Sequence, residues 1–425
     1  MQRFVGILGI LLFILIAYLL SSKRKSINWQ TIAWGFGLQV TFAVLILKTA
    51  PGKWLFSKCN DIIIAILNCA QDGARFVFGN LVNMFVEVGK FDQSGNFVTV
   101  NDLVVNNGMA IFAFSVLPTI IFFSALMSIL YHYGIMQRVV AGIAWVMSKT
   151  MKTSGSESLS SASNIFVGQT EAPLVIKPYL KKMTKSELNA VMVCGFATVA
   201  GGVLAAYVGL LKEALPDIAG HLLAASIMSA PAGLMFAKLF VPETEESETY
   251  GGAKITIEKV NQNGIDAAAS GAGVGLKLAL NVGAMLIAFI GIVALVNLIL
   301  GQFPGDLSLA KIFGWVLSPV AWAMGVPSSD IFKFGDLLGT KLMVTEFIAY
   351  MKLQTYAASL SPKSMIIGAY ALCGFANLGS IGIQIGGISA LASDRRGDLA
   401  KLGLRAMIAG AFASWTTACI AGILL

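Results

Sequence analysis

The sequence predicts an all-α polytopic membrane protein with eight transmembrane helices, two re-entrant hairpins, interfacial helices and an inverted-topology repeat. Three observations support this fold class. Of the 425 residues, 56% are hydrophobic and 12% are charged, with a mean hydropathy of +0.78, which excludes an ordinary soluble domain. Apolar runs of roughly 20 residues, the length that a ~30 Å hydrocarbon core requires, recur along the whole chain. Short motifs from the first half of the chain also recur in the second half.

Taken in chain order, the apolar runs define eight spans. The first run continues into Lys23, Arg24 and Lys25 without a small-residue cleavage site, so we interpret it as a retained span and not as a signal peptide. Residues 61–89 and 133–149 are apolar but interrupted by charges and amides, which is typical of interfacial helices. The spans are expected at residues 4–20, 31–48, 109–131, 187–211, 218–240, 274–301, 364–391 and 404–425.

The positive charges indicate how these spans are oriented. The net charge of +8 does not predict a nucleic-acid partner, because the basic residues gather in short loops and do not interleave with aromatic residues. With both termini outside, the clusters at 23–25, 177–185, 238–259 and 395–405 all lie in the cytoplasm, and the lysines at 48–58 are the exception. We therefore expect a multi-pass protein of the inner or plasma membrane, surrounded by the lipid bilayer.

Two further features narrow the possible chemistry of the chain. Residues 242–271 are polar, with several glutamates and glycines, and are expected to form a cytoplasmic linker between spans five and six. The five cysteines are scattered, mostly inside apolar runs, and include no C-x-x-C pair. Neither a disulfide framework nor a zinc site is therefore predicted.

Three short motifs indicate an internal repeat. Their separations are 177, 175 and 179 residues, in the same order. Because an odd number of spans lies between the two copies, the second copy is inverted relative to the first. Inverted repeats with broken helices are typical of secondary transporters, which bind their substrate near the membrane midplane. The matching motifs are I-A-W-V-M and V-A-W-A-M around Trp145 and Trp322, Thr170-Glu171 and Thr345-Glu346, and C-G-F-A from Cys194 and from Cys373.

In each copy, a threonine precedes a glutamate at the expected start of a half-helix. Thr170 is expected to cap that half-helix, and Pro173 lies in its first turn, where a missing N–H costs nothing. A glutamate in such a turn needs no function, because the helix dipole favours a carboxylate there. Carboxylates at membrane depth are costly, however, and usually have a partner, which favours a functional role for Glu171 and Glu346.

The functional interpretation places both glutamates in one cavity. Residues 153–182 are rich in serine and broken by glycine and proline, so they cannot face lipid and are expected to form a re-entrant hairpin. Residues 328–352 form the second hairpin. Carboxylates only accept hydrogen bonds, so Glu171 and Glu346, with Gln169 alongside, suit a ligand rich in O–H and N–H donors.

Two spans are expected to be locally unwound. The segments 194–203 and 373–387 lie within apolar runs but carry glycines together with hydroxyl or amide groups. Free carbonyl groups there, with Asn164 and Thr198, would suit a hard cation such as sodium. Close helix packing is the alternative explanation for the glycines. Phe375 either stacks on a flat ligand or fills the core.

At G-Q-T-E-A-P (168–173), T-E-F (345–347) and C-G-F-A-N-L-G-S-I-G-I-Q-I-G (373–386), the sequence resembles the concentrative nucleoside transporter family. The resemblance extends over most of the chain from span three to the end. It implies eight spans, three interfacial helices and two hairpins in a homotrimer that moves nucleosides inward with sodium, or with protons in some members.

The resemblance also implies a role for individual residues. Two positions depart from the family's usual pattern, because Thr345 stands where Asn is common and Thr198 where Ser is common. Each threonine keeps an oxygen, so the implied function survives, while the resemblance no longer fixes the selectivity. The implied nucleobase-binding positions are Gln169, Thr170, Glu171 and Val203; the ribose-binding positions are Glu346, Asn377 and Ser380, with Phe375 close to the ligand; and the sodium positions are Asn164, Val167, Thr198 and Val199, the valines through their carbonyl groups.

An elevator motion, in which a transport domain slides past a scaffold, is the transport mechanism that the resemblance implies. The scaffold consists of residues 1–150, with spans one to three and interfacial helices, and residues 272–305, with span six. The transport domain consists of residues 151–241, with hairpin one and spans four and five, and residues 306–425, with an interfacial helix, hairpin two and spans seven and eight. Residues 242–271 form the cytoplasmic linker.

We therefore predict a symporter that imports nucleosides of the uridine, cytidine and adenosine type down a sodium gradient, with no cofactor besides the coupling ion. Proton coupling through a carboxylate such as Glu171 is the first alternative. The second is a membrane-embedded enzyme that uses Glu171 and Glu346 as acid and base, and the third is a passive channel. The chain has no nucleophile elbow, zinc-protease motif or P-loop, which weakens both the enzyme interpretation and that of an ATP-driven pump.

Overall fold

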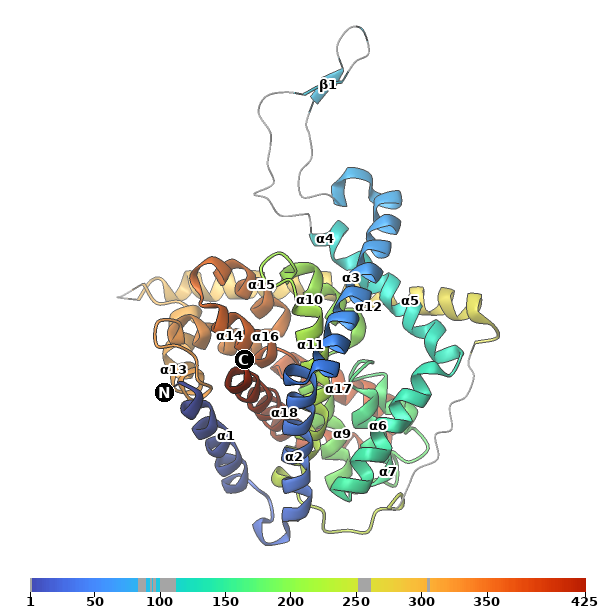
Figure 1. The fold of residues 1–425 in the computed structure, drawn as a ribbon, viewed down its shortest axis with the longest axis vertical. Coiled ribbons are helices and arrows are strands. Elements are labelled where there is room, and N and C mark those ends of the chain that lie inside the picture. Colours follow the sequence, from blue (N-terminus) through green and yellow to red (C-terminus); the bar gives the residue numbers. More distant parts are fainter. Residues whose placement is uncertain are drawn as a thin grey trace.

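A computed structural model describes residues 2–82, 89–91, 94, 97–99, 112–250, 261–303 and 306–425. The described chain is almost entirely helical, as the sequence predicts (Figure 1). Its one sheet is a two-stranded antiparallel ribbon of β1 (Gly89–Phe91) and β2 (Phe97–Thr99), which projects beyond the helical body. This ribbon was not predicted from the sequence.

All eight expected spans coincide with helices. Span one is α1 (Gln2–Leu19), and span seven consists of α16 (Pro362–Ala371) and α17 (Leu378–Leu391). Span six begins at Gly264 instead of residue 274, and residues 109–111 of span three lie outside the described residues. Within the described residues, six helical stretches are long and apolar enough to cross a membrane: Trp29–Lys48, Phe112–His132, Lys185–Leu211, Ile218–Phe240, Gly264–Leu300 and Ser393–Leu424.

The first interfacial helix begins earlier than its sequence suggests. Helix α3 (Ala50–Phe78) starts directly after α2 (Trp29–Lys48), and the Gly52 N–H donates to the Thr49 Oγ1 at 3.0 Å. This cap, with Pro51 in the first turn, explains the early start. The lysines at positions 53 and 58 therefore lie on a helix and not in a loop. The other expected interfacial helices are α6 (Ile135–Met151) and α13 (Leu309–Ala323).

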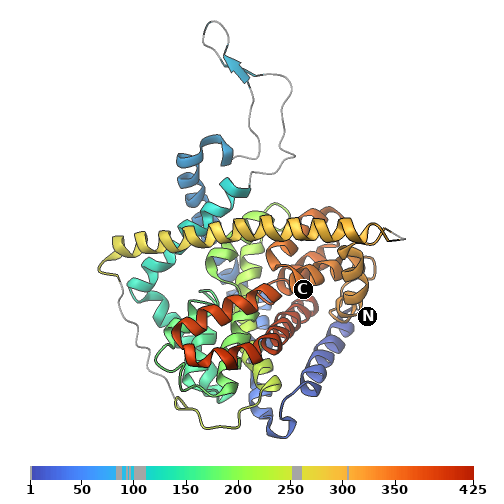
Figure 2. The same cartoon turned by 180° about the vertical axis from the view of Figure 1, so that it is seen from behind.

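Burial divides the spans into inner and outer helices. In α11 (Ile218–Phe240), 89% of the most apolar window is buried, against 6% in α12 (Gly264–Leu300). Helix α12 packs against α5 (Leu117–His132) and crosses the outside of the molecule (yellow in Figure 2). Its exposed side chains include Ile287 and Leu298. An apolar helix with so much exposed surface must contact lipid or another copy of the chain.

The two copies of the repeat contain the same elements in the same order. Each has an interfacial helix, a helix-turn-helix hairpin and a span that breaks near its middle. The expected breaks are confirmed, because residues 198–200 and 372–377 are not helical. In the first copy these elements are α6, α7 (Gly155–Ser163), α8 (Ala172–Val175), α9 (Lys185–Ala197) and α10 (Gly201–Leu211); in the second they are α13, α14 (Ile331–Met343), α15 (Glu346–Tyr356), α16 and α17.

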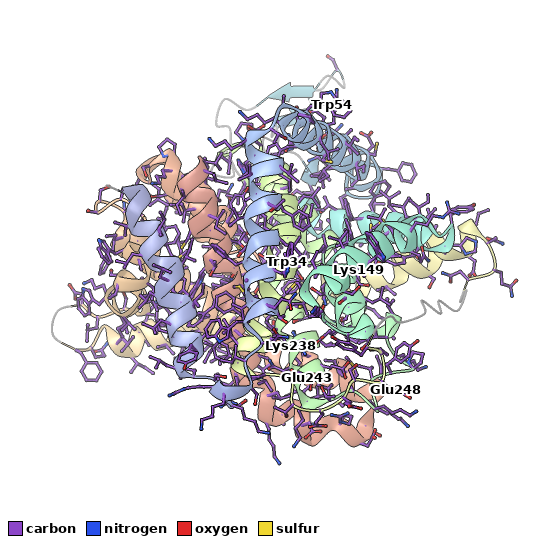
Figure 3. The ribbon with its side chains drawn as sticks, turned by 60° about the horizontal axis from the view of Figure 1, so that its bottom comes forward. Trp34, Trp54, Lys149, Lys238, Glu243 and Glu248 are labelled. Carbon is purple, nitrogen blue, oxygen red and sulfur yellow. The ribbon has the colours of Figure 1, made fainter. Side chains whose placement is uncertain are left out.

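The first part of the expected linker packs on the base of hairpin one. The buried Lys238 ammonium lies 2.8 Å from the Glu157 carboxylate and 3.2 Å from that of Glu243. Lys182 pairs with Glu248 at 2.7 Å, and this hydrogen bond and the Glu248 charge raise the pKa of Lys182. Figure 3 labels Lys238, Glu243 and Glu248 in the lower half of the view. Residues 251–260 lie outside the described residues, and the helix from Gly264 takes in the end of the expected linker.

Candidate functional site

The two broken spans touch each other at their breaks. Gly374 has a φ of +105°, and a Cβ atom there would lie 2.6 Å from the carbonyl oxygen of Phe196 and 2.8 Å from the Ala197 carbonyl carbon. Only glycine adopts this conformation without strain and lets the two backbones approach so closely. The unwound segments of spans four and seven therefore form one centre, to which both hairpins contribute side chains.

Hairpin two contributes Glu346 to this centre. Its carboxylate accepts hydrogen bonds from the Tyr207 hydroxyl at 3.1 Å and from the Asn377 Nδ2 at 2.6 Å. Asn377 also caps α17, because its Oδ1 accepts from the Ser380 N–H at 2.7 Å. The structure thus brings together the three residues that the resemblance assigned to ribose. The expected start of the half-helix is also confirmed, since Thr345 is the N-cap of α15.

Tyr207 is a site residue that the sequence analysis missed. It is fully buried in α10, whose other residues are glycine or aliphatic, and it donates to a carboxylate 139 positions away. The available signal was a single hydroxyl-bearing side chain in an apolar half-helix. Val203 in α10 and Phe375 in the break of span seven are both buried. Their burial is compatible with either interpretation of Phe375, ligand stacking or core packing.

Gln169, at the turn of hairpin one, is held by Gln384 of α17. The Gln384 Nε2 donates to the Gln169 Oε1 at 2.9 Å and to the Met192 carbonyl oxygen at 3.1 Å. A Cβ atom on Gly195 would lie 2.8 Å from the same Nε2, so this glycine leaves room for the amide. Gln384 lies within the motif at residues 373–386, but no role was predicted for it. In the structure, it joins hairpin one to both broken spans.

Thr170 does not act as the predicted helix cap. Helix α8 begins at Ala172, Glu171 occupies the N-cap position, and no side chain makes a capping hydrogen bond there. Thr170 lies against α17, since a Cβ atom on Gly387 would be 2.8 Å from its Cγ2. Pro173 does lie in the first turn of α8, as predicted. The turn closes through the backbone, with the Glu171 N–H donating to the Gly168 carbonyl oxygen at 3.1 Å.

Glu171 lines a cavity of about 660 Å³ between hairpin one and the outer helices α5 and α12. Its carboxylate lies over Gly168, where a Cβ atom would be 2.2 Å from the Glu171 Oε2. The opposite wall carries polar side chains of α5: Ser124, Ser128 and Tyr131. The volume falls in the range of small-molecule sites. Glu346 does not line this cavity, so in this conformation the two carboxylates have separate surroundings.

The residues expected to bind sodium lie at the end of α7 and in the break of span four. Asn164 is the C-cap of α7 and is 1% exposed; its Nδ2 donates to the Ser160 carbonyl oxygen at 3.0 Å, but its Oδ1 is buried without a partner among the described residues. Leaving such an oxygen unpaired costs about 1–3 kcal/mol, which a bound cation would offset. Thr198 and Val199 lie in the break and Val167 in the hairpin turn.

The chemistry of these oxygens suits a hard cation. Amide, hydroxyl and backbone carbonyl groups are the ligands that hard cations prefer, and no sulfur or imidazole is needed. Within the described part of the chain, no cluster of three His, Cys, Asp or Glu residues has the geometry of a metal site. Thr198 Oγ1 donates to the Cys194 carbonyl oxygen at 2.9 Å, so the lone pairs of this hydroxyl remain available.

Three family models match the chain. Residues 8–81 match the N-terminal model of the Na+ dependent nucleoside transporters, and residues 221–422 match the C-terminal model. Residues 113–214, which include hairpin one and the break of span four, match a model described as nucleoside recognition. Both hairpins and both broken spans therefore lie within the matched regions.

Relatives and solved structures agree with these matches. An uncharacterized transporter of Haemophilus influenzae is 44% identical over 99% of this chain and 97% of its own length. The sodium/nucleoside cotransporter 1 of Mus musculus is 40% identical over 100% of this chain, which spans 64% of that protein. The structure of CNTnw in an inward-facing substrate-bound state is 42% identical, with a TM-score of 0.89 over 99% of this chain and 98% of the other. The structure of an outward-facing CNTnw variant is also 42% identical, with a TM-score of 0.88 over 100% of this chain and 98% of the other.

Proposed function

The chain belongs to the Na+ dependent, or concentrative, nucleoside transporter family, and we propose that it imports nucleosides together with sodium by an elevator-type mechanism. The relatives are nucleoside transporters and not enzymes, so the embedded-enzyme alternative is set aside. The observation that carries the proposal is the buried cluster of Glu346, Tyr207 and Asn377 beside the two touching helix breaks.

The chemistry of this cluster favours a ribose. A carboxylate accepts several hydrogen bonds at once, so Glu346 suits two neighbouring hydroxyl groups, with Asn377 and Ser380 as further polar contacts. The nucleobase would lie toward Gln169, Thr170, Glu171 and Val203, and Phe375 would stack on it or border it. Nucleosides of the uridine, cytidine and adenosine type all combine a ribose diol with a base that carries at least one N–H donor.

Sodium coupling follows if the ion and the nucleoside stabilise the same conformation of hairpin one. A cation at Asn164, Val167, Thr198 and Val199 would organise the turn that carries Gln169 and Glu171. Each ligand would then raise the affinity for the other, because coupling between two sites is reciprocal. The unpartnered Oδ1 of Asn164 supports sodium as the coupling ion. A proton on a carboxylate such as Glu171 is the alternative.

The position of the cavity supports the proposed division into a scaffold and a transport domain. The cavity lies between α5 and α12 on one side and hairpin one and α10 on the other. It extends to Tyr133 and Asn261, at the helix ends that the basic clusters place in the cytoplasm. We infer that this conformation opens inward, with both termini outside. Exposed apolar side chains on α12 would supply scaffold contacts in a homotrimer.

Uptake into proteoliposomes tests the proposal. Vesicles with an inward sodium gradient are expected to accumulate uridine above equilibrium, and vesicles in choline are not. A panel of purine and pyrimidine nucleosides would define the preference, and the Glu346→Gln variant serves as the control for specific transport. If uridine accumulates equally in choline but responds to a proton gradient, the coupling ion is the proton. Flux that neither saturates nor concentrates the nucleoside would instead indicate a channel.

A further inference from the structure

Lys341 is a fully buried cation that the proposed transport cycle does not use. It lies in the last turn of α14, in hairpin two, with 0% of its surface exposed. Its ammonium group donates to the carbonyl oxygens of Ala371 at 2.8 Å and Cys373 at 3.2 Å, and to the Ser414 Oγ at 3.0 Å. Among the described residues, no carboxylate lies within 4.0 Å of it.

The hydrogen-bond partners of Lys341 are those that a charged ammonium group requires. Ser414 Oγ donates its own hydrogen to the Ala411 carbonyl oxygen at 3.0 Å, so it can only accept from Lys341. All three partners are therefore acceptors, which matches the three N–H groups of an ammonium ion. A neutral amine has only two N–H groups, and its lone pair would face the third acceptor.

The two carbonyl groups belong to the break of span seven. Ala371 is the last residue of α16, and Cys373 lies in the unwound segment. The last carbonyl groups of a helix have no partner within the helix, and they carry the negative end of its dipole. A cation placed there satisfies these oxygens and stabilises the broken conformation.

The first copy of the repeat has a comparable place with no side-chain cation. The motif separations of 175 to 179 residues align Lys341 with residues 162–166, and Asn164 lies at the centre of that range. Both residues lie at the end of the first arm of their hairpin. Lys341 contacts the break of span seven, and the turn that follows Asn164 contacts the break of span four, where the Gly201 N–H donates to the Phe166 carbonyl oxygen at 3.0 Å. One copy presents an amide with an unpartnered oxygen, and the other presents an ammonium with three oxygen partners.

We propose that the Lys341 ammonium is a tethered cation that fills, in the second copy, the place where the first copy binds its coupling ion. This inference depends on the proposed function. Hairpin two is then held against span seven at any salt concentration, with Glu346 and Asn377 in place for the ribose. Hairpin one alone responds to sodium, so these two positions contribute one coupling ion per chain. Lys341 is thus a positioning residue for substrate binding.

The test uses the full-length Lys341→Ala variant in detergent and in proteoliposomes. Removing the side chain opens a space lined by three oxygens, which a small external cation can enter. We expect uridine to bind at least about 10-fold more weakly in sodium alone, with methylammonium restoring at least half of that loss; the sodium dependence should become steeper, its Hill coefficient rising from about 1 toward 2. Unchanged sodium dependence, or a loss of binding that methylammonium leaves untouched, overturns the proposal.

Two further variants separate positioning from general stability. Lys352→Ala removes another lysine of hairpin two, paired with Asp336 at 2.8 Å, and is expected to lower the melting temperature without any response to methylammonium.

Lys341→Gln fills the space without a charge and covers the case in which the alanine variant does not fold. We expect it to lose the preference for uridine over 2′,3′-dideoxyuridine at every sodium concentration, without rescue; a retained preference contradicts the proposal. Wild-type uptake independent of sodium would refute the coupling proposal, while methylammonium rescue of uridine binding would still report on Lys341.

Discussion

Replacing Glu346 by glutamine tests the ribose site, because the change keeps the shape of the side chain and removes its charge. The carboxylate accepts from the Tyr207 hydroxyl at 3.1 Å and the Asn377 Nδ2 at 2.6 Å. In the variant, the single amide oxygen must face the NH2 group of Asn377, since two donors cannot face each other. The new NH2 group then points to the Tyr207 hydroxyl, which can rotate and accept.

The free protein therefore tolerates the change, and the loss is concentrated in substrate binding. A hydrogen bond to a charged group contributes about 1.5–3 kcal/mol, and each 1.4 kcal/mol is a factor of ten in affinity. We expect Glu346→Gln to weaken uridine binding by roughly 10- to 100-fold. Tyr207→Phe removes one donor to the carboxylate and should weaken it by about 5-fold, roughly 1 kcal/mol.

Calorimetric titration of purified protein with uridine and with 2′,3′-dideoxyuridine measures both effects. The dideoxy ligand lacks the diol, so its affinity should change less than about 3-fold in Glu346→Gln, the residual effect being a few tenths of a kcal/mol. The melting temperature of each variant serves as the control for folding. Wild-type affinity for uridine in a folded Glu346→Gln variant would refute the assignment of Glu346 to the ribose.

Three further predictions concern the parts that hold the site together. Gly374→Ala should lower the free energy of unfolding by about 2 kcal/mol or more, because of its positive φ and its contact with span four, and so lower the melting temperature. The control is Gly382→Ala, whose added Cβ meets no described atom within 4 Å and should leave the melting temperature unchanged. Equal melting temperatures of the two variants would contradict the close approach of the breaks. Gln384→Ala leaves the Gln169 oxygen unpaired and should lower stability by about 1–3 kcal/mol; unfolding at the wild-type temperature would show that the link contributes nothing. Asn164→Leu should raise the half-saturating sodium concentration for uridine uptake at least about 10-fold, or about 1.4 kcal/mol, and an unchanged value would remove Asn164 from the ion site.

Local features of the sequence were sufficient for much of the architecture. A bilayer requires about 20 apolar residues per span, so hydropathy located all eight spans, with the largest displacement at span six, whose helix begins at Gly264 instead of residue 274. Glycines and polar groups inside apolar runs located the breaks in spans four and seven, because such residues disfavour a continuous helix facing lipid. Thr345 was correctly expected at the start of a half-helix, since a cap depends on the adjacent backbone.

Predictions of caps, helix starts and short strands were less accurate where the neighbouring residues allowed more than one structure. Thr170 resembles Thr345 in sequence, yet it packs on α17 and caps nothing, because the turn of hairpin one closes through its own backbone. Helix α3 begins at Ala50 because Thr49 caps it, a local signal that the neighbouring charges at positions 48, 53 and 58 obscured. The β-ribbon was missed because two strands of three residues have no measurable periodicity.

Sequence alone determined the membrane-spanning helices, the repeat and the two Thr-Glu pairs, since each is a property of consecutive residues. Tertiary structure alone decided the partners of the buried polar groups. Gln384 meets Gln169 from 215 positions away, and Lys341 reaches carbonyl groups that exist as free acceptors only because span seven breaks. It also decided that Glu171 lines an open cavity while Glu346 is covered. The physical reason is that a buried polar group requires a hydrogen-bond partner, and packing can supply it from any position in the chain. Hydropathy does not indicate how far along the sequence that partner lies.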